Sequence, residues 1–211
     1  VPVIQGQVLQ VAGRLEASYS NAGESATVAG SMEAATTQDM QFTSGEHRLA
    51  ILTGTGVRGQ MNDGTVTSAG LNVQGRYEYA GAPFTTPLVA ALTGEVNYEQ
   101  ATGIGGNATA TLSQDATLQV GQNATTVVLK QGSNATAAIE QNEVKSVTGD
   151  LGFKADIPTI QSQVIKVDDK LNGSYTNTGG QSTVRGSVDA AMTQDIELTT
   201  GEHKFSILTG T

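Results

Sequence analysis

The chain contains no cysteine and no tryptophan, and only 4 of its 211 residues are proline. Without cysteine the protein can form neither a disulfide framework nor a thiolate active site. Charged residues make up 15% of the chain and aromatic residues 4%, whereas charged residues usually reach about 25%. No stretch approaches the roughly 20 apolar residues of a membrane helix, so we expect no membrane span.

Basic residues are also scarce. Lys and Arg number 11 against 20 Asp and Glu, which leaves a formal net charge of −9. Nucleic-acid binding depends on clustered Lys and Arg that neutralise phosphates, and the basic residues of this chain are scattered. The composition therefore argues against nucleic acid as a partner and favours a soluble or cation-binding surface.

Uncharged polar residues and glycine fill the deficit, with 28 threonines and 26 glycines. Thr and Val pack well on pleated strands, and most segments alternate, so that Val184 and Val188 would face away from Arg185 and Asp189. The stretch Asn62–Gly64 is a typical hairpin turn. We predict an all-β fold of antiparallel β-sandwich or barrel units in tandem, with over ~40% strand and under ~10% helix.

A long internal repeat dominates the sequence. Residues 4–55 align without a gap on residues 160–211, and 28 of the 52 aligned pairs are identical. We therefore predict one complete β unit at 1–158 and a partial second copy at 159–211, equivalent to 3–55. Four pairs of apolar positions should be equally buried in both copies: Leu15/Leu171, Tyr19/Tyr175, Val28/Val184 and Ile51/Ile207.

The second copy covers only about one-third of a unit. We expect either a longer tandem array or a partial copy that completes a fold begun elsewhere, and we favour the array. An uncovered Val, Ile, Leu or Phe side chain would cost about 1.5–3 kcal/mol. We therefore predict that residues 160–211 pack against another repeat or another chain.

Residues 104–142 form a polar segment rich in Asn, Gln and Thr, in which Asn-Ala-Thr occurs three times. The stretch from Gln131 to Gln141 resembles the Gln-Gly-Asn-Ala-Gln pattern of curli-type amyloid subunits, in which Asn and Gln stack in ladders along a fibre. The triplets follow one another at uneven intervals of 16 and 11 residues, and we interpret the segment as polar strands joined by Asn-containing turns. Lys130 and Glu140 are its main charges, so little in it opposes edge-to-edge pairing.

The repeated turn supplies the candidate metal ligands. These are Asp39, Glu46 and His47 in the first copy and Asp195, Glu202 and His203 in the second. Carboxylates and imidazoles bind divalent cations, but adjacent strand residues point to opposite faces. Glu46 and His47 would therefore converge only within a turn. We interpret both stretches as solvent-facing turns and keep a metal or pH-sensing site as the alternative.

Four asparagines satisfy the glycan acceptor rule: Asn107, Asn123, Asn134 and Asn172. They matter only if a glycosylating cell secretes the protein. The chain contains no G-x-S-x-G motif, and both histidines lie in the repeated turn, so a hydrolytic triad is not supported.

The pattern favours an extracellular or cell-surface structural protein that assembles with itself into a fibre, sheath or surface layer. We expect it to act without a cofactor and not as an enzyme. The alternative is an adhesin or tail-fibre-like module that recognises a surface glycan or protein. Its few aromatic residues weigh against glycan stacking. A glycan or a divalent cation would be the further ligand.

Overall fold

The structure is a computed structural model that describes residues 3–4, 7–8, 10–22, 25–121, 125–158, 164–200 and 202–209. Strands make up 78% of this part of the chain, and it contains no helix. Every strand pair is antiparallel, which confirms the predicted all-β antiparallel fold. The strands are β1 (Val3–Ile4), β2 (Gln7–Val8), β3 (Val11–Ala22), β4 (Ser25–Thr36), β5 (Met40–Ser44), β6 (His47–Ile51), β7 (Gly56–Asn62), β8 (Thr65–Tyr79), β9 (Leu88–Glu99), β10 (Gly103–Leu112), β11 (Ala116–Val120), β12 (Thr125–Leu129), β13 (Asn134–Glu140), β14 (Glu143–Pro158), β15 (Val164–Thr178), β16 (Gln181–Met192), β17 (Ile196–Thr200) and β18 (His203–Ile207).

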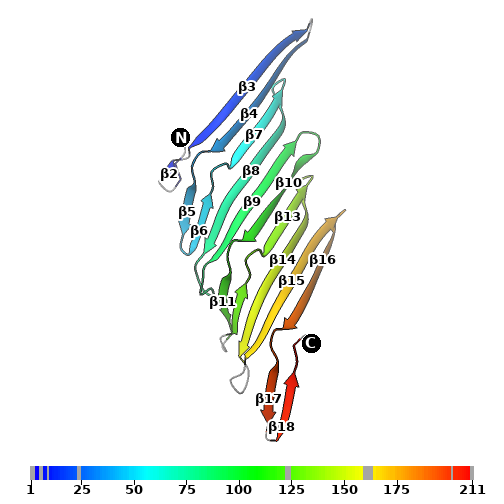
Figure 1. Cartoon of the computed structure of the whole chain (residues 1–211). Coiled ribbons are helices and arrows are strands. Elements are labelled where there is room, and N and C mark those ends of the chain that lie inside the picture. The colour runs from blue at the N-terminus through cyan, green and yellow to red at the C-terminus, as the bar shows by residue number, and fades with distance from the viewer. Residues whose placement is uncertain are drawn as a thin grey trace.

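One 14-stranded sheet contains most of the strands. Ten strands lie side by side in the order β3, β4, β7, β8, β9, β10, β13, β14, β15 and β16 (Figure 1). Two short hairpins, β5–β6 and β11–β12, extend the sheet at one end of these strands. β6 pairs with the second half of β8, beyond β7, and β12 pairs with the second half of β14, beyond β13. The third short hairpin, β17–β18, forms its own two-stranded sheet.

The strand pattern repeats at half the length of the sequence repeat. Strands β3 to β8 and strands β9 to β14 follow the same order with the same pairings, and β15 to β18 begin a third round. Asp63 and Gly64 form a turn with positive φ angles, and Gln141 and Asn142 form the same turn 78 positions later. A β-bulge follows each of these turns, with Thr67 as the extra residue in β8 and Lys145 as the extra residue in β14. The 156-residue repeat thus contains two copies of a six-strand module.

The sheet has one apolar and one polar face. Residues directly opposite one another on neighbouring strands share a face, and Leu15 lies opposite Met32, whereas the adjacent Arg14 lies opposite Glu33. Apolar side chains continue on the Leu15 face across the whole sheet, and most remain exposed. In this article the Leu15 side is called the apolar face and the Arg14 side the polar face.

The described strands form neither a closed barrel nor two packed layers, so the sandwich or barrel predicted from the sequence is not confirmed. The expected equal burial is wrong for three of the four pairs of apolar positions, since Leu15 is 77% exposed and Leu171 38%, whereas Ile51 and Ile207 are both half-buried. The chain exposes 13598 Å², compared with ~9,200 Å² for a globular protein of its mass. Alternation in a sequence specifies which face of a sheet is apolar, but it does not specify what covers that face.

Three of the seven buried apolar residues in the described part of the chain lie where the short hairpins begin. Met40, Ala116 and Ile196 open β5, β11 and β17, and each is less than 5% exposed. Each directly follows a Gln-Asp pair. The three rounds of the module therefore share one buried position at the base of each short hairpin.

Candidate functional site

The aspartates of the three Gln-Asp pairs brace these hairpin bases. Oδ1 of Asp39 accepts the backbone N–H of Thr53 at 2.7 Å, Oδ1 of Asp115 that of Gln131 at 2.7 Å, and Oδ1 of Asp195 that of Thr209 at 2.6 Å. Asp39 and Asp195, both metal-site candidates, are thus engaged with backbone donors. The corresponding role of Asp115 was not predicted, although its place in a Gln-Asp pair like those of Asp39 and Asp195 could have indicated it.

The other metal-site candidates lie at the far end of the hairpin. Met40, next to Asp39, pairs with Ile51, whereas His47 pairs with Ser44 at the turn, about 13 Å along the strand. Among the residues that the structure describes, no three His, Cys, Asp or Glu side chains come together as a metal site. Glu202 occupies the equivalent exposed turn of β17–β18. The side chain of His203 lies outside the described part.

His47 instead belongs to an aromatic cluster. Its Nδ1 lies 2.7 Å from the hydroxyl of Tyr77, and its ring centroid lies 4.9 Å from that of Tyr79. Phe84 meets Tyr79 edge to face at 5.9 Å. The alternation in Tyr77-Glu78-Tyr79 places both tyrosines on one face, a signal in the sequence that could have predicted the cluster.

Glu46 completes this arrangement from the turn. The pKa of the Tyr79 hydroxyl is raised, first by partial burial and then by the charge and hydrogen bond of Glu46. A side chain at Gly81 would collide with the Glu46 carboxylate and come within 2.6 Å of the Tyr79 hydroxyl. The backbone N–H of Ala80 also donates to the Glu46 carbonyl at 3.0 Å. The cluster fastens the hairpin turn to the segment after β8 and presents rings, hydroxyls and a carboxylate together.

Three of the four predicted glycan acceptors can be placed. Asn107 is exposed in β10, and Asn172 is half-buried in β15. Asn134 opens β13, and its side-chain amide donates to the Gly132 carbonyl at 3.3 Å. Asn123 lies outside the described residues. Glycosylation at these sites stays a prediction.

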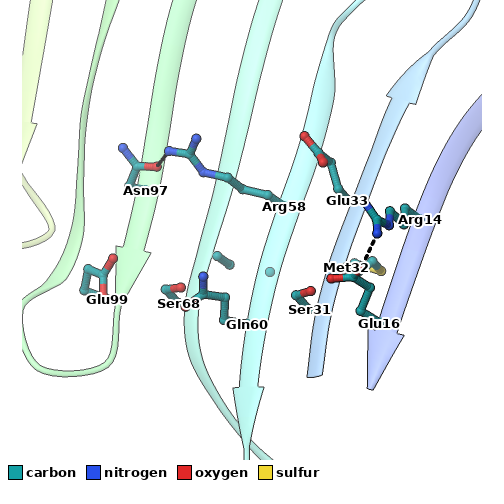
Figure 2. Close-up of a pocket in the computed structure, with 12 residues that line it drawn as sticks. Arg14, Glu16, Ser31, Met32, Glu33, Arg58, Gln60, Ser68, Asn97 and Glu99 are labelled. Atoms are coloured by element: carbon teal, nitrogen blue, oxygen red, sulfur yellow. Dashed lines mark hydrogen bonds and ion pairs between the residues drawn. The ribbon is translucent and has the colours of Figure 1, made fainter. Parts of the chain in front are cut away.

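The polar face carries a groove of about 660 Å³ across β3, β4, β7, β8 and β9 (Figure 2). Arg14, Glu33 and Arg58 lie opposite one another on successive strands. Arg58 then reaches across β8 to form an ion pair with Glu95 and a 3.1 Å hydrogen bond with Asn97. The charges of Arg14, Glu33 and Arg58 alternate in sign across the strands, and Arg14 forms an ion pair with Glu16 on its own strand (Figure 2).

The apolar face carries a groove of about 750 Å³ on the same strands and on β10. Its lining includes Leu15, Met32, Met61, Leu71, Tyr98 and Ile104. Several of these side chains are exposed, including Leu71 at 39% and Tyr98 at 38%. Apolar patches of this extent mark surfaces that another molecule covers.

The sheet also has open edges. No described strand pairs with the outer edge of β3 or with the outer edge of β16. Unpaired backbone donors and acceptors along such an edge form a template for another strand. Together with the apolar face, these edges are the candidate binding surfaces of the described chain.

The chain matches no protein-family model, no curated protein and no solved structure. The part of the chain that the structure describes has no helix long and apolar enough to cross a membrane.

Proposed function

We propose that this chain is a non-enzymatic structural protein of the cell surface or extracellular space, which assembles with itself into a fibre, sheath or surface layer. The observation that carries the proposal is the pair of open edges at the two ends of one continuous sheet. Subunits would associate by β-augmentation, in which the edge strand of one molecule extends the sheet of the next.

The strand count supports head-to-tail joining. The row from β3 to β16 contains ten strands, all paired antiparallel to their neighbours. Because ten is even, β3 and β16 run in opposite directions. A second copy placed beyond β16 therefore continues the antiparallel pattern and keeps its apolar face on the same side. Head-to-tail contacts of this type generate filaments unless their rotation closes a ring.

The sandwich predicted from the sequence becomes, in this proposal, a property of the assembled form. Two such sheets packed through their apolar faces would lie about 10 Å apart. The chain exposes 13598 Å², about half as much again as a globular protein of its mass. This excess is large enough to supply the roughly 2,000–5,000 Å² of total area that obligate homodimers bury.

Purified protein at neutral pH without added ligand tests the proposal. We expect light scattering to report growing particles and electron microscopy to resolve filaments or layers. A dilution series should shift the equilibrium toward smaller species, because assembly depends on concentration. A folded monomer that persists at high concentration would refute the assembly function.

The aromatic cluster favours one alternative, an adhesin-type module that binds a surface glycan or protein. His47 is exposed, and it lies beside Tyr77, Tyr79 and the carboxylate of Glu46. Rings and polar groups in such proximity can stack on a sugar and hydrogen-bond its hydroxyls. Glycan-array binding by the unaltered chain, lost in Tyr79→Ala and kept in Tyr19→Ala, would support this alternative.

A further inference from the structure

We infer that two copies of this chain join through β3 of one and β16 of the other in a single register, with Val11 opposite Met192 and Ala22 opposite Gln181. This inference rests on the proposed assembly function and specifies its interface. Both strands are 12 residues long, so this register overlaps them from end to end. Four independent properties of the two strands agree with it.

The first property is the direction of the unpaired backbone groups. The N–H of Thr37 donates to Gln10, whereas the N–H of Thr36 donates to Thr55 on the other side. Along a strand of an antiparallel sheet, successive residues form their backbone hydrogen bonds alternately with the strand on one side and the strand on the other. The odd-numbered residues of β4 therefore bond to β3. The even-numbered residues of β3 lie opposite these residues of β4 and bond to them. The odd-numbered residues of β3, including Leu15, therefore present their backbone N–H and C=O groups at the free edge.

The same reasoning applies to β16. The N–H of Thr193 donates to Lys166 on the β15 side, so the odd-numbered residues of β16 bond to β15. The even-numbered residues therefore present their donors and acceptors at the free edge. In the inferred register all six outward residues of β3 meet all six of β16. The pairs are Val11/Met192, Gly13/Ala190, Leu15/Val188, Ala17/Gly186, Tyr19/Val184 and Asn21/Ser182.

The second property is the identity of the faces. Leu15 and Val188 both lie on the apolar face, Leu15 opposite Met32 and Val188 opposite Leu171. The register sets them opposite each other, and it sets Tyr19 opposite Val184. A shift by one residue would place these side chains opposite polar-face residues and lose the pairing.

Charge complementarity is the third property. The register places Arg14 opposite Asp189, and both side chains lie on the polar face. Glu16 then lies opposite Ser187 and has Arg185 and Asp189 on its two diagonals, about 7–8 Å away. A shift by two residues in one direction would instead place Glu16 opposite Asp189, and like charges directly opposite are destabilising.

The fourth property is precedent within the chain. β16 already pairs with β15 in the corresponding register, where Val188 faces Leu171 and Asp189 faces Lys170. Leu15 and Arg14 occupy these same positions in the first copy of the repeat. β16 therefore meets on β3 a strand of the same pattern that it already accepts on its inner edge.

Engineered cysteines test the register directly, because the chain has no cysteine of its own. Leu15 and Val188 lie nine strand spacings apart in one molecule, or about 43 Å, so a disulfide between them must join two molecules. In the inferred register their Cα atoms would lie about 5.5 Å apart, within disulfide range. Both side chains are exposed, at 77% and 59%, so Leu15→Cys and Val188→Cys should leave the fold intact, as circular dichroism would verify.

We expect the full-length double variant to form a covalent ladder under mild oxidation on a non-reducing gel. An equal mixture of the two single variants should form a covalent dimer. The matched control combines Leu15→Cys with Gly186→Cys, which reports the register shifted by two residues, and it should cross-link at least 10-fold less. Filaments that cross-link only through the control pair, or through Leu15→Cys alone, would overturn the register while leaving the assembly function intact. A chain that stays monomeric in light scattering would overturn both.

Discussion

The carboxylate of Asp39 accepts the backbone N–H of Thr53 at 2.7 Å and so closes the base of the β5–β6 hairpin. The same bond recurs from Asp115 to Gln131 and from Asp195 to Thr209. Each aspartate directly precedes the buried residue that opens a short strand. A charged acceptor at this position fixes the chain where it leaves a long strand and begins a short one.

Replacement of Asp115 by Ala should therefore destabilise the fold by about 1–3 kcal/mol, because the backbone donor of Gln131 loses a charged acceptor. Asp115→Asn keeps a carbonyl oxygen at the same place and should lose less than half of that amount. Urea unfolding followed by circular dichroism measures both changes. Equal losses in the two variants would contradict a hydrogen-bonding role.

The hydroxyl of Tyr79 should ionise at a higher pH than a tyrosine of ordinary pKa. Its folded-state pKa is raised by partial burial and then by Glu46, so the stabilising contribution is complete below the unfolded pKa of about 10. That contribution is lost as the pH rises through the raised value. Spectrophotometric titration at alkaline pH should resolve a late transition that disappears in Tyr79→Phe.

Glu46→Gln should shift this late transition to lower pH without removing it, because burial is the larger cause. Glu78→Gln is the matched control, since Glu78 pairs with Arg48 and Arg76. An unchanged Tyr79 transition in Glu46→Gln would show that the Glu46 carboxylate does not act on the hydroxyl.

The turn at Gln141 offers a stabilising substitution. Gln141 and Asn142 both have positive φ angles, of 51° and 67°, in a turn where Asn and Gly are preferred at the first position. Gln141→Asn should raise the free energy of unfolding by about 0.5–1 kcal/mol. The thermal midpoint measures the gain, and Gln141→Val, which is β-branched and strained at positive φ, should lower it.

The two faces of β4 should respond differently to the same charge. Met32→Glu places a carboxylate in the groove of the apolar face and should weaken face-to-face association at least 10-fold, about 1.4 kcal/mol. Ser31→Glu places the same carboxylate on the polar face and should leave that association within 2-fold. Sedimentation of both variants provides the measurement. Equal effects would refute apolar-face packing between sheets.

A second charge reversal should compensate for the first at the inferred contact between Arg14 and Asp189. Arg14→Asp or Asp189→Arg alone should weaken filament growth by roughly 5-fold, since exposed ion pairs contribute up to about 1 kcal/mol. The double variant restores opposite charges across the interface and should recover most of the growth rate. Because exposed charges are screened, the single-variant defects should shrink in 1 M salt. If the losses of growth rate in the two single variants add up in the double variant, the result would contradict direct contact between Arg14 and Asp189.

Much of the fold could be predicted from local pattern. The alternation around Arg185 predicted the strands and their two faces, and Asn62–Gly64 predicted the β7–β8 turn. The half-length module could not be predicted in this way. Its middle round differs so much from the other two that the Gln-Asp pairs at Asp39, Asp115 and Asp195 are among the few residues retained in all three.

Which residues lie together at the candidate site was harder to predict from the sequence than the fold. Asp39 and His47 are 8 positions apart, yet the hairpin sends them to opposite ends. His47 meets Tyr77 and Tyr79 only because β6 pairs with the far half of β8, a contact set by topology. The expected burial of Leu15 was wrong because residue type predicts the apolar side, whereas the covering layer depends on molecules outside the sequence.

The order of strands also determines how the protein would carry tension. β3 and β16 lie at opposite ends of the row, so a pull between these edges acts along the hydrogen bonds, which run perpendicular to antiparallel strands. Such a load puts each hydrogen-bonded ladder of the row in tension and shears none of them. Within one chain the connecting segments hold neighbouring strands together, so an assembled thread would come apart at the contact between β16 of one copy and β3 of the next, which no covalent bond bridges.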